Sequence, residues 1–110
     1  MVMWFNVPQA RNFLLQNGFV YTLRPKPYRL RSKKKRGIDV LMFNRFEKRG
    51  EVYFEFIKVV DDPEELKPLV KYSGFKTLEE WLRKAGENRC LFKVILLDEW
   101  DKEHLDFEGD

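Results

Sequence analysis

The residues best suited to chemistry in this sequence are basic and tyrosine side chains gathered in one stretch of the chain. They are Tyr21, Arg24, Lys26, Tyr28, Arg29, Arg31, Lys33, Lys34, Lys35 and Arg36. Lysine and arginine neutralise phosphates and release counterions from a nucleic acid, and arginine can hold a phosphate with two hydrogen bonds. Tyrosine rings stack on unpaired bases. The combination predicts contact with an RNA loop or single strand through residues 24–36, called here the basic segment.

The net charge of +3 conceals an uneven distribution of charge along the chain. Residues 1–38 hold nine Lys or Arg and no Asp or Glu, and the remaining 72 residues hold 12 bases and 18 acids. Residues 98–110 carry seven of those acids. Such asymmetry predicts an anionic partner for the basic segment. The alternative is that the acidic tail, of the same or another copy, neutralises this segment.

Other residue types that carry catalysis or bind metals are scarce. The chain has one cysteine, Cys90, and one histidine, His104, which argues against a disulfide framework, a zinc site or a Ser-His-Asp triad. Cys90 precedes an apolar run, so we expect a buried, inert thiol. Asp61-Asp62 and Glu64-Glu65 fit a helix start better than paired-carboxylate catalysis. The six glycines are scattered, which argues against a phosphate-binding loop, and no metal or cofactor is predicted.

The elements that must position the basic segment begin with a short strand at 3–5 and a helix. Asn6 is a candidate cap for that helix and Pro8 suits its first turn. Gly18 is expected to end it in the left-handed conformation. The β-branched and aromatic run 19–23 then predicts a strand that leads directly into the basic segment.

Three further strands are predicted at 38–43, 51–60 and 91–97. In 51–60 apolar and polar residues alternate, which indicates one solvated face and therefore an antiparallel sheet. Residues 45–50 are expected to form a turn closed by glycine. The run 91–97 is apolar except for Lys93, so it should be an interior strand covered on both faces.

Two short helices are predicted between the last two strands. Asp62, followed by proline and glutamates, has the signature of a capped helix start. Thr77 and Glu80 form a second capping signature, and Gly86 should end the helix that follows. Trp81 shares a helical face with apolar neighbours, so we expect it to be a buried anchor rather than a ligand platform.

This order of elements predicts a mainly β domain with α+β elements, in the form of a small, mostly antiparallel β-barrel whose openings are covered by short helices. With 110 residues the chain suffices for one domain, placed at 1–97, followed by an acidic tail at 98–110. No apolar run is long enough to span a membrane and no signal peptide is evident. We therefore expect a soluble, cytoplasmic protein, and leave its oligomeric state open.

Two stretches of the sequence resemble the ASCH group of domains, small relatives of the RNA-binding PUA domain. They are Asn-Gly-Phe-Val-Tyr-Thr-Leu-Arg at 17–24 and Ser-Gly-Phe-Lys-Thr-Leu-Glu-Glu-Trp-Leu at 73–82, the latter preceding the strand at 91–97. The resemblance is closest to short, stand-alone archaeal members and covers roughly residues 3–97. It implies a PUA-like β-barrel with a cleft suited to RNA or a nucleoside.

The resemblance also implies an enzymatic alternative. Some ASCH members hydrolyse an amide on a modified cytidine, with Lys, Thr and Glu in roles resembling base, nucleophile and acid. ASCH domains often carry Gly-x-Lys-x-x-Glu-x-Arg after the first helix. Here Gly18 matches, but Val20, Leu23 and Pro25 stand at the Lys, Glu and Arg positions. Thr22 remains as a candidate nucleophile, without the neighbouring lysine that would activate it.

The sequence thus favours a non-catalytic RNA-binding or nucleoside-binding module. The first alternative is a small amidohydrolase that uses Thr22, with a remote lysine such as Lys58 or Lys93 brought close by the fold. The second is a protein-interaction domain whose basic segment binds an acidic partner.

Overall fold

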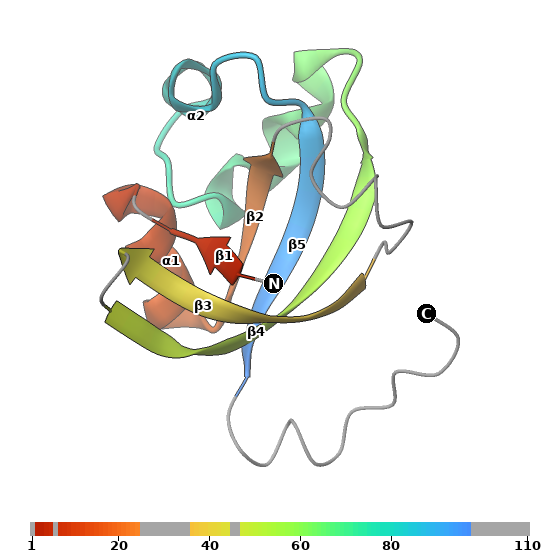
Figure 1. Cartoon of the computed structure of the whole chain (residues 1–110). Helices are drawn as coiled ribbons and strands as arrows, with labels where there is room; N and C mark the ends of the chain where they lie inside the picture. The colour runs from red at the N-terminus through yellow and green to blue at the C-terminus, as the bar shows by residue number, and fades with distance from the viewer. Residues whose placement is uncertain (1, 6, 25–35, 45–46, 98–110) are drawn as a thin grey trace.

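The computed structural model describes residues 2–5, 7–24, 36–44 and 47–97 (Figure 1). Its elements in chain order are β1 (Val2–Trp4), α1 (Pro8–Asn17), β2 (Phe19–Arg24), β3 (Arg36–Asn44), β4 (Glu47–Val59), the 3₁₀ helix η1 (Pro63–Tyr72), α2 (Leu78–Ala85) and β5 (Cys90–Leu97). Most of the basic segment and the acidic tail lie outside the described residues. None of the helices within these ranges is long and apolar enough to cross a lipid bilayer.

The five strands form one sheet in the order β1-β3-β4-β5-β2. β3, β4, β5 and β2 pair with one another antiparallel in that order, and β1 pairs with the outer side of β3 in parallel. The small antiparallel α+β fold is therefore confirmed, as is the interior position of β5. Barrel closure is not seen in the described part of the chain, where β1 and β2 form opposite edges of an open sheet. Alternation of apolar and polar residues along a strand fits a closed barrel and an open sheet equally, because each of them buries one face of every strand.

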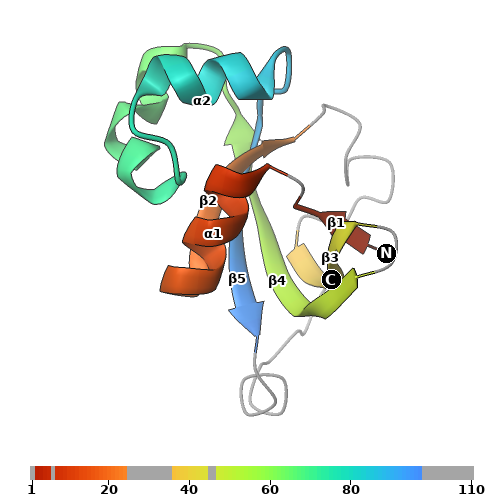
Figure 2. The same cartoon turned by 90° about the vertical axis from the view of Figure 1, so that its left-hand side faces the viewer.

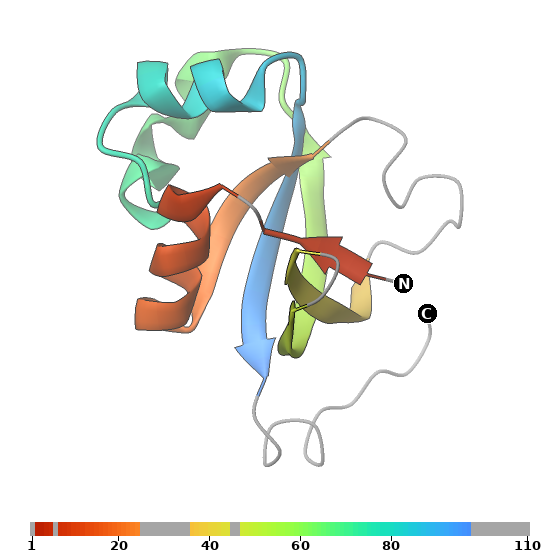
Figure 3. The ribbon, with the colours of Figure 1, turned by 60° about the vertical axis from the view of Figure 1, so that its left-hand side comes forward.

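Two apolar clusters hold the helices on the sheet. In the first, Ala10 and Leu14 of α1 pack on strand residues such as Val20, Phe54 and Phe92. The second cluster packs η1 and α2 on the strands; its buried members are Leu23, Val60, Leu66, Phe75, Trp81 and Leu91. Figures 2 and 3 show α1 lying alongside β2, with η1 and α2 together beyond one end of the strands.

The predicted helix ends are largely confirmed. Gly18 is left-handed (φ 82°) and its N–H donates to the Leu14 carbonyl at 2.8 Å. Asp62 forms a complete capping box with Glu65, and the Thr77 hydroxyl accepts from the Glu80 N–H at 3.1 Å. These caps depend only on neighbours three or four residues away.

The predicted turn at Gly50 and the predicted Asn6 cap of α1 both need correction. Gly50, expected to close a turn, lies inside β4 with φ 126° beside a register shift in the β3–β4 pairing. A glycine can mark a bulge as well as a turn, because both use backbone conformations that other residues avoid. The helical N-cap position of α1 is occupied by Val7, without a side-chain hydrogen bond, and Asn6 lies outside the described residues.

Candidate functional site

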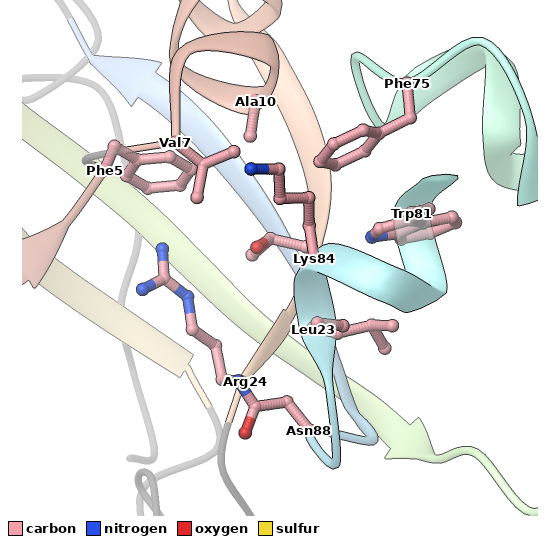
Figure 4. Close-up of a pocket in the computed structure, with 11 residues that line it drawn as sticks. Phe5, Val7, Ala10, Leu23, Arg24, Phe75, Trp81, Lys84 and Asn88 are labelled. Atoms are coloured by element: carbon pink, nitrogen blue, oxygen red, sulfur yellow. The ribbon is translucent and has the colours of Figure 1, made fainter. Parts of the chain in front are cut away.

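A pocket of about 350 Å³ lies where the end of β2, the start of α1 and α2 meet (Figure 4). Much of its wall is apolar and aromatic, with Phe5, Phe75 and Trp81 as the large rings. Its polar lining residues are Thr22, Arg24, Lys84 and Asn88. A mostly apolar hollow with a few polar groups is the usual form of a small-ligand site, and this volume is at the small end of that range.

Strand alternation brings Thr22 and Arg24 to the same face of β2. Successive side chains of a strand point to opposite faces, so both residues share the side of Val20, which packs in the cluster formed with α1. The Arg24 guanidinium lies 4.6 Å from the centroid of the Phe5 ring, and its Nε is buried. The pocket thus contains a cation held over an aromatic ring at the point where the basic segment leaves β2.

The opposite wall comes from one face of α2. Trp81, Lys84 and Ala85 follow one another at intervals of three and one residues, the spacing that lines one side of a helix, and Asn88 lies in the connection that follows the helix. Burial of Trp81, which is only 2% exposed, confirms the predicted anchor and fixes the orientation of this face. The packing of Trp81 against the core therefore places Lys84 and Asn88 at the pocket.

A close backbone contact sets the spacing between α1 and the chain before α2. A Cβ on Gly74 would lie 2.3 Å from the carbonyl oxygen of Gln9, so the approach requires glycine, which also suits the φ of 89°. The contact brings the next residue, Phe75, to the pocket wall.

The charged residues that line the pocket are Arg24 and Lys84. Figure 4 shows the Lys84 side chain reaching into it toward Val7 and Ala10, with the Arg24 guanidinium beside Phe5. Lys84 forms no hydrogen bond or ion pair with any described residue, and none of the described lining residues is acidic. The Lys84 ammonium, which is exposed, is therefore the positive charge at the pocket that an anionic ligand could reach.

Of the ten residues predicted to bind nucleic acid, the structure describes three. Arg24 lines the pocket. Arg36 begins β3 opposite Glu55. Tyr21 occupies the other face of β2 from Arg24 and packs partly buried beside Tyr72, at 6.1 Å between ring centroids. The predicted residues outside the described ranges are Lys26, Tyr28, Arg29, Arg31, Lys33, Lys34 and Lys35.

The lysines considered as partners for Thr22 are placed differently from Lys84. Lys58 is hydrogen-bonded to Glu65, which raises the pKa of Lys58 above its ordinary value and disfavours it as a base. Lys93 lies over the Phe19 and Tyr21 rings, on the far face of β2 from Thr22. Lys84 shares the pocket with Thr22 and was missed by sequence reasoning, although its spacing from Trp81 was a usable signal.

The remaining candidate residues do not form a second centre in the described ranges. Cys90 is completely buried, as predicted, at the start of β5. Among residues 2–97 with their gaps, no three His, Cys, Asp or Glu side chains are grouped in a way that could hold a metal ion. His104 lies outside the described residues.

Neither protein-family models, nor curated proteins, nor solved structures give a match to this chain. Its function is therefore argued from the pocket itself.

Proposed function

We propose that this protein binds RNA without catalysis, receiving an unpaired nucleotide in the pocket and the flanking phosphates on the basic segment. The observation that supports this most is the pairing of Arg24 and Lys84 with a pocket walled by Phe5, Phe75 and Trp81. A mostly apolar wall suits burial of a base, and an exposed Lys84 ammonium suits a phosphate beside it. No described lining residue would repel them.

The position of the pocket on the chain supports the same proposal. Arg24 is the last residue of β2, and residues 25–36, which hold seven further bases and no acids, follow it directly. A nucleotide in the pocket would therefore lie near the most basic part of the sequence. Each phosphate contact made there would add affinity through counterion release.

We further propose that the chain is an ASCH-like relative of the PUA domain, acting in the cytoplasm. The order of a helix, three strands, two short helices and a final strand supports this kinship, since it is the order on which the resemblance rests. The PUA-like barrel is part of this proposal.

Titrating the purified protein into a labelled single-stranded RNA at several salt concentrations tests the proposal. We expect affinity to fall between about 50 and 200 mM salt, with a log–log slope of about −0.7 per phosphate contact. Fluorescence anisotropy gives both quantities. An affinity that is unchanged by salt would contradict phosphate contact. Failure to bind RNA, together with altered self-association on deletion of 98–110, would instead favour the acidic tail as partner of the basic segment.

A second candidate function is hydrolysis of an acylated nucleoside, favoured by the presence of Thr22 and Lys84 in one pocket. The Thr22 hydroxyl would attack the acyl carbon and give its proton to the Lys84 amine. The C–N bond would then break, the amine would leave with that proton, and water would hydrolyse the ester. We rank this function second because none of the described lining residues is a carboxylic acid that could serve as the acid.

We expect no release of acetate from N4-acetylcytidine by the purified protein, measured by chromatography of the nucleoside. Hydrolysis that disappears in Thr22→Ala and in Lys84→Gln, while both variants keep the thermal midpoint of the parent, would reverse the order of the two functions. Hydrolysis retained in Thr22→Ala would exclude this threonine as the nucleophile.

A further inference from the structure

We propose that the acidic tail, residues 98–110, packs on the outer face of the sheet through Trp100, Leu105 and Phe107. The outer face is the one directed away from the apolar cluster formed with α1. This contact is separate from RNA binding and does not depend on it. It gives the tail an apolar partner within its own chain instead of the basic segment.

The outer face carries one row of side chains that crosses four strands. Ile38 pairs with Tyr53, Tyr53 pairs with Ile95, and Ile95 pairs with Phe19. Residues directly opposite one another in a sheet share a face, so these four form one apolar row. Val20, the neighbour of Phe19, packs in the cluster with α1, so the row lies on the opposite face from that cluster.

The row is not part of either apolar core. All four of its side chains are partly exposed, and none belongs to the two clusters that hold the helices on the sheet. At one end Phe19 contacts Phe13 and Tyr72, with 5.7 and 5.5 Å between ring centroids. The rest of the row extends away from these rings across the sheet. A contiguous, partly exposed apolar surface of this kind marks an interaction site.

Residues 98–110 begin at this surface. Leu97, the last residue of β5, lies two residues beyond Ile95 and therefore on the outer face. It is 8% exposed although it belongs to neither cluster, so the apolar surface continues to the point where the tail begins. Thirteen extended residues span about 45 Å, whereas four strands are about 14 Å across. The tail can therefore reach the whole row.

The sequence of the tail supplies the complementary side chains. Trp100, Leu105 and Phe107 are large and apolar, and they stand among seven acids and one lysine. Burial of such side chains on an apolar surface is favourable. Attachment to β5 gives the tail an effective concentration of the order of millimolar at the row, so a weak contact suffices. A second copy of the chain lacks this advantage in a dilute solution.

The charges of the outer face distinguish this contact from one with the basic segment. Arg36, Glu55 and Lys93 form the next row, and Glu51 lies opposite Leu97, so two bases offset two acids. An acidic tail gains little electrostatically from such a surface. The proposed contact is therefore apolar and should persist in salt, whereas a contact of the tail with the basic segment would weaken.

The test is fluorine NMR of the full chain labelled with fluorotryptophan, which gives one resonance for each of the three tryptophans. The Trp100 resonance is the one that is lost in Trp100→Phe. We expect its H2O–D2O isotope shift to be about half or less of the value for free fluorotryptophan, because packing removes water from the ring. The value should be the same at about 50 and about 500 mM salt.

Ile38→Ser and Ile95→Ser should each raise this isotope shift toward the value for the free amino acid, because they remove apolar surface under the tail. Leu105→Ser combined with Phe107→Ser should do the same without changing any described strand. Leu15→Ser is the matched control, because Leu15 is 46% exposed on α1 rather than on the sheet, and it should leave the shift unchanged. Circular dichroism melting verifies that each variant is folded.

An isotope shift of Trp100 equal to that of free fluorotryptophan in the parent protein would overturn the inference. So would protection that is lost on dilution, which would assign the contact to a second copy, or protection that is lost in salt, which would assign it to the basic segment. A shift that stays low in the sheet variants would place Trp100 elsewhere and would also overturn it. RNA binding is measured separately by anisotropy, and its failure would bear on the proposed function alone.

Discussion

Replacing Trp81 with alanine should lower the free energy of unfolding by about 3–5 kcal/mol, the range for removal of a large aromatic side chain from a core. Trp81 is 2% exposed and packs in the cluster that holds η1 and α2 on the sheet, with Leu66, Phe75 and Leu91 among its buried members. Its loss would leave a cavity that this cluster cannot close without moving α2. The urea midpoint, followed by far-UV circular dichroism, measures the effect.

A matched control is Leu15→Ala on α1, since Leu15 is 46% exposed and a surface change of this kind usually costs no more than about 0.5 kcal/mol. The loss of unfolding free energy in Trp81→Phe should fall between the losses in Trp81→Ala and Leu15→Ala, because phenylalanine keeps an apolar ring in the same place. An unchanged midpoint for Trp81→Ala would show that α2 is not anchored by this residue, and the placement of Lys84 at the pocket would lose its basis.

Changing Lys33, Lys34, Lys35 and Arg36 together to glutamine should weaken RNA binding and flatten its salt dependence. Each lost phosphate contact should reduce the log–log slope by about 0.7, so four lost contacts would reduce it by about 2.8. The thermal midpoint should move little, because surface substitutions rarely change stability by more than about 0.5 kcal/mol each. Anisotropy titrations between 50 and 200 mM salt, beside the parent protein, measure both effects.

The control for net charge is a second four-fold variant in which Lys67, Lys71, Lys76 and Arg83 become glutamine. These four side chains are exposed on η1, α2 and the chain between them, and none lines the pocket. The control variant should keep most of the salt dependence of RNA affinity, because the four charges that it lacks lie outside the basic segment and the pocket. Equal losses in the two variants would indicate a general effect of net charge and would refute a specific role for the basic segment.

Several features of the fold could be predicted because they depend on near neighbours in the chain. The left-handed end of α1 at Gly18, the Asp62 and Thr77 caps and the burial of Trp81 each follow from residues within one or two helical turns. The alternation along β4 likewise required only a period of two. Local rules failed where one residue type serves two purposes, as at Gly50, which lies within β4 rather than in a turn.

Most of the elements, the antiparallel pairing of the main sheet and the concentration of positive charge after β2 could thus be predicted from the sequence. Which residues share a site depends on how distant parts of the chain pack together. The fold places α2 beside the end of β2, so Arg24 and Lys84, sixty residues apart in the sequence, line one pocket, while Tyr21 lies on the other face of β2 from Arg24. Strand pairing and helix docking are set by the fit of apolar surfaces that lie far apart in the chain, and no local period of the sequence encodes that fit.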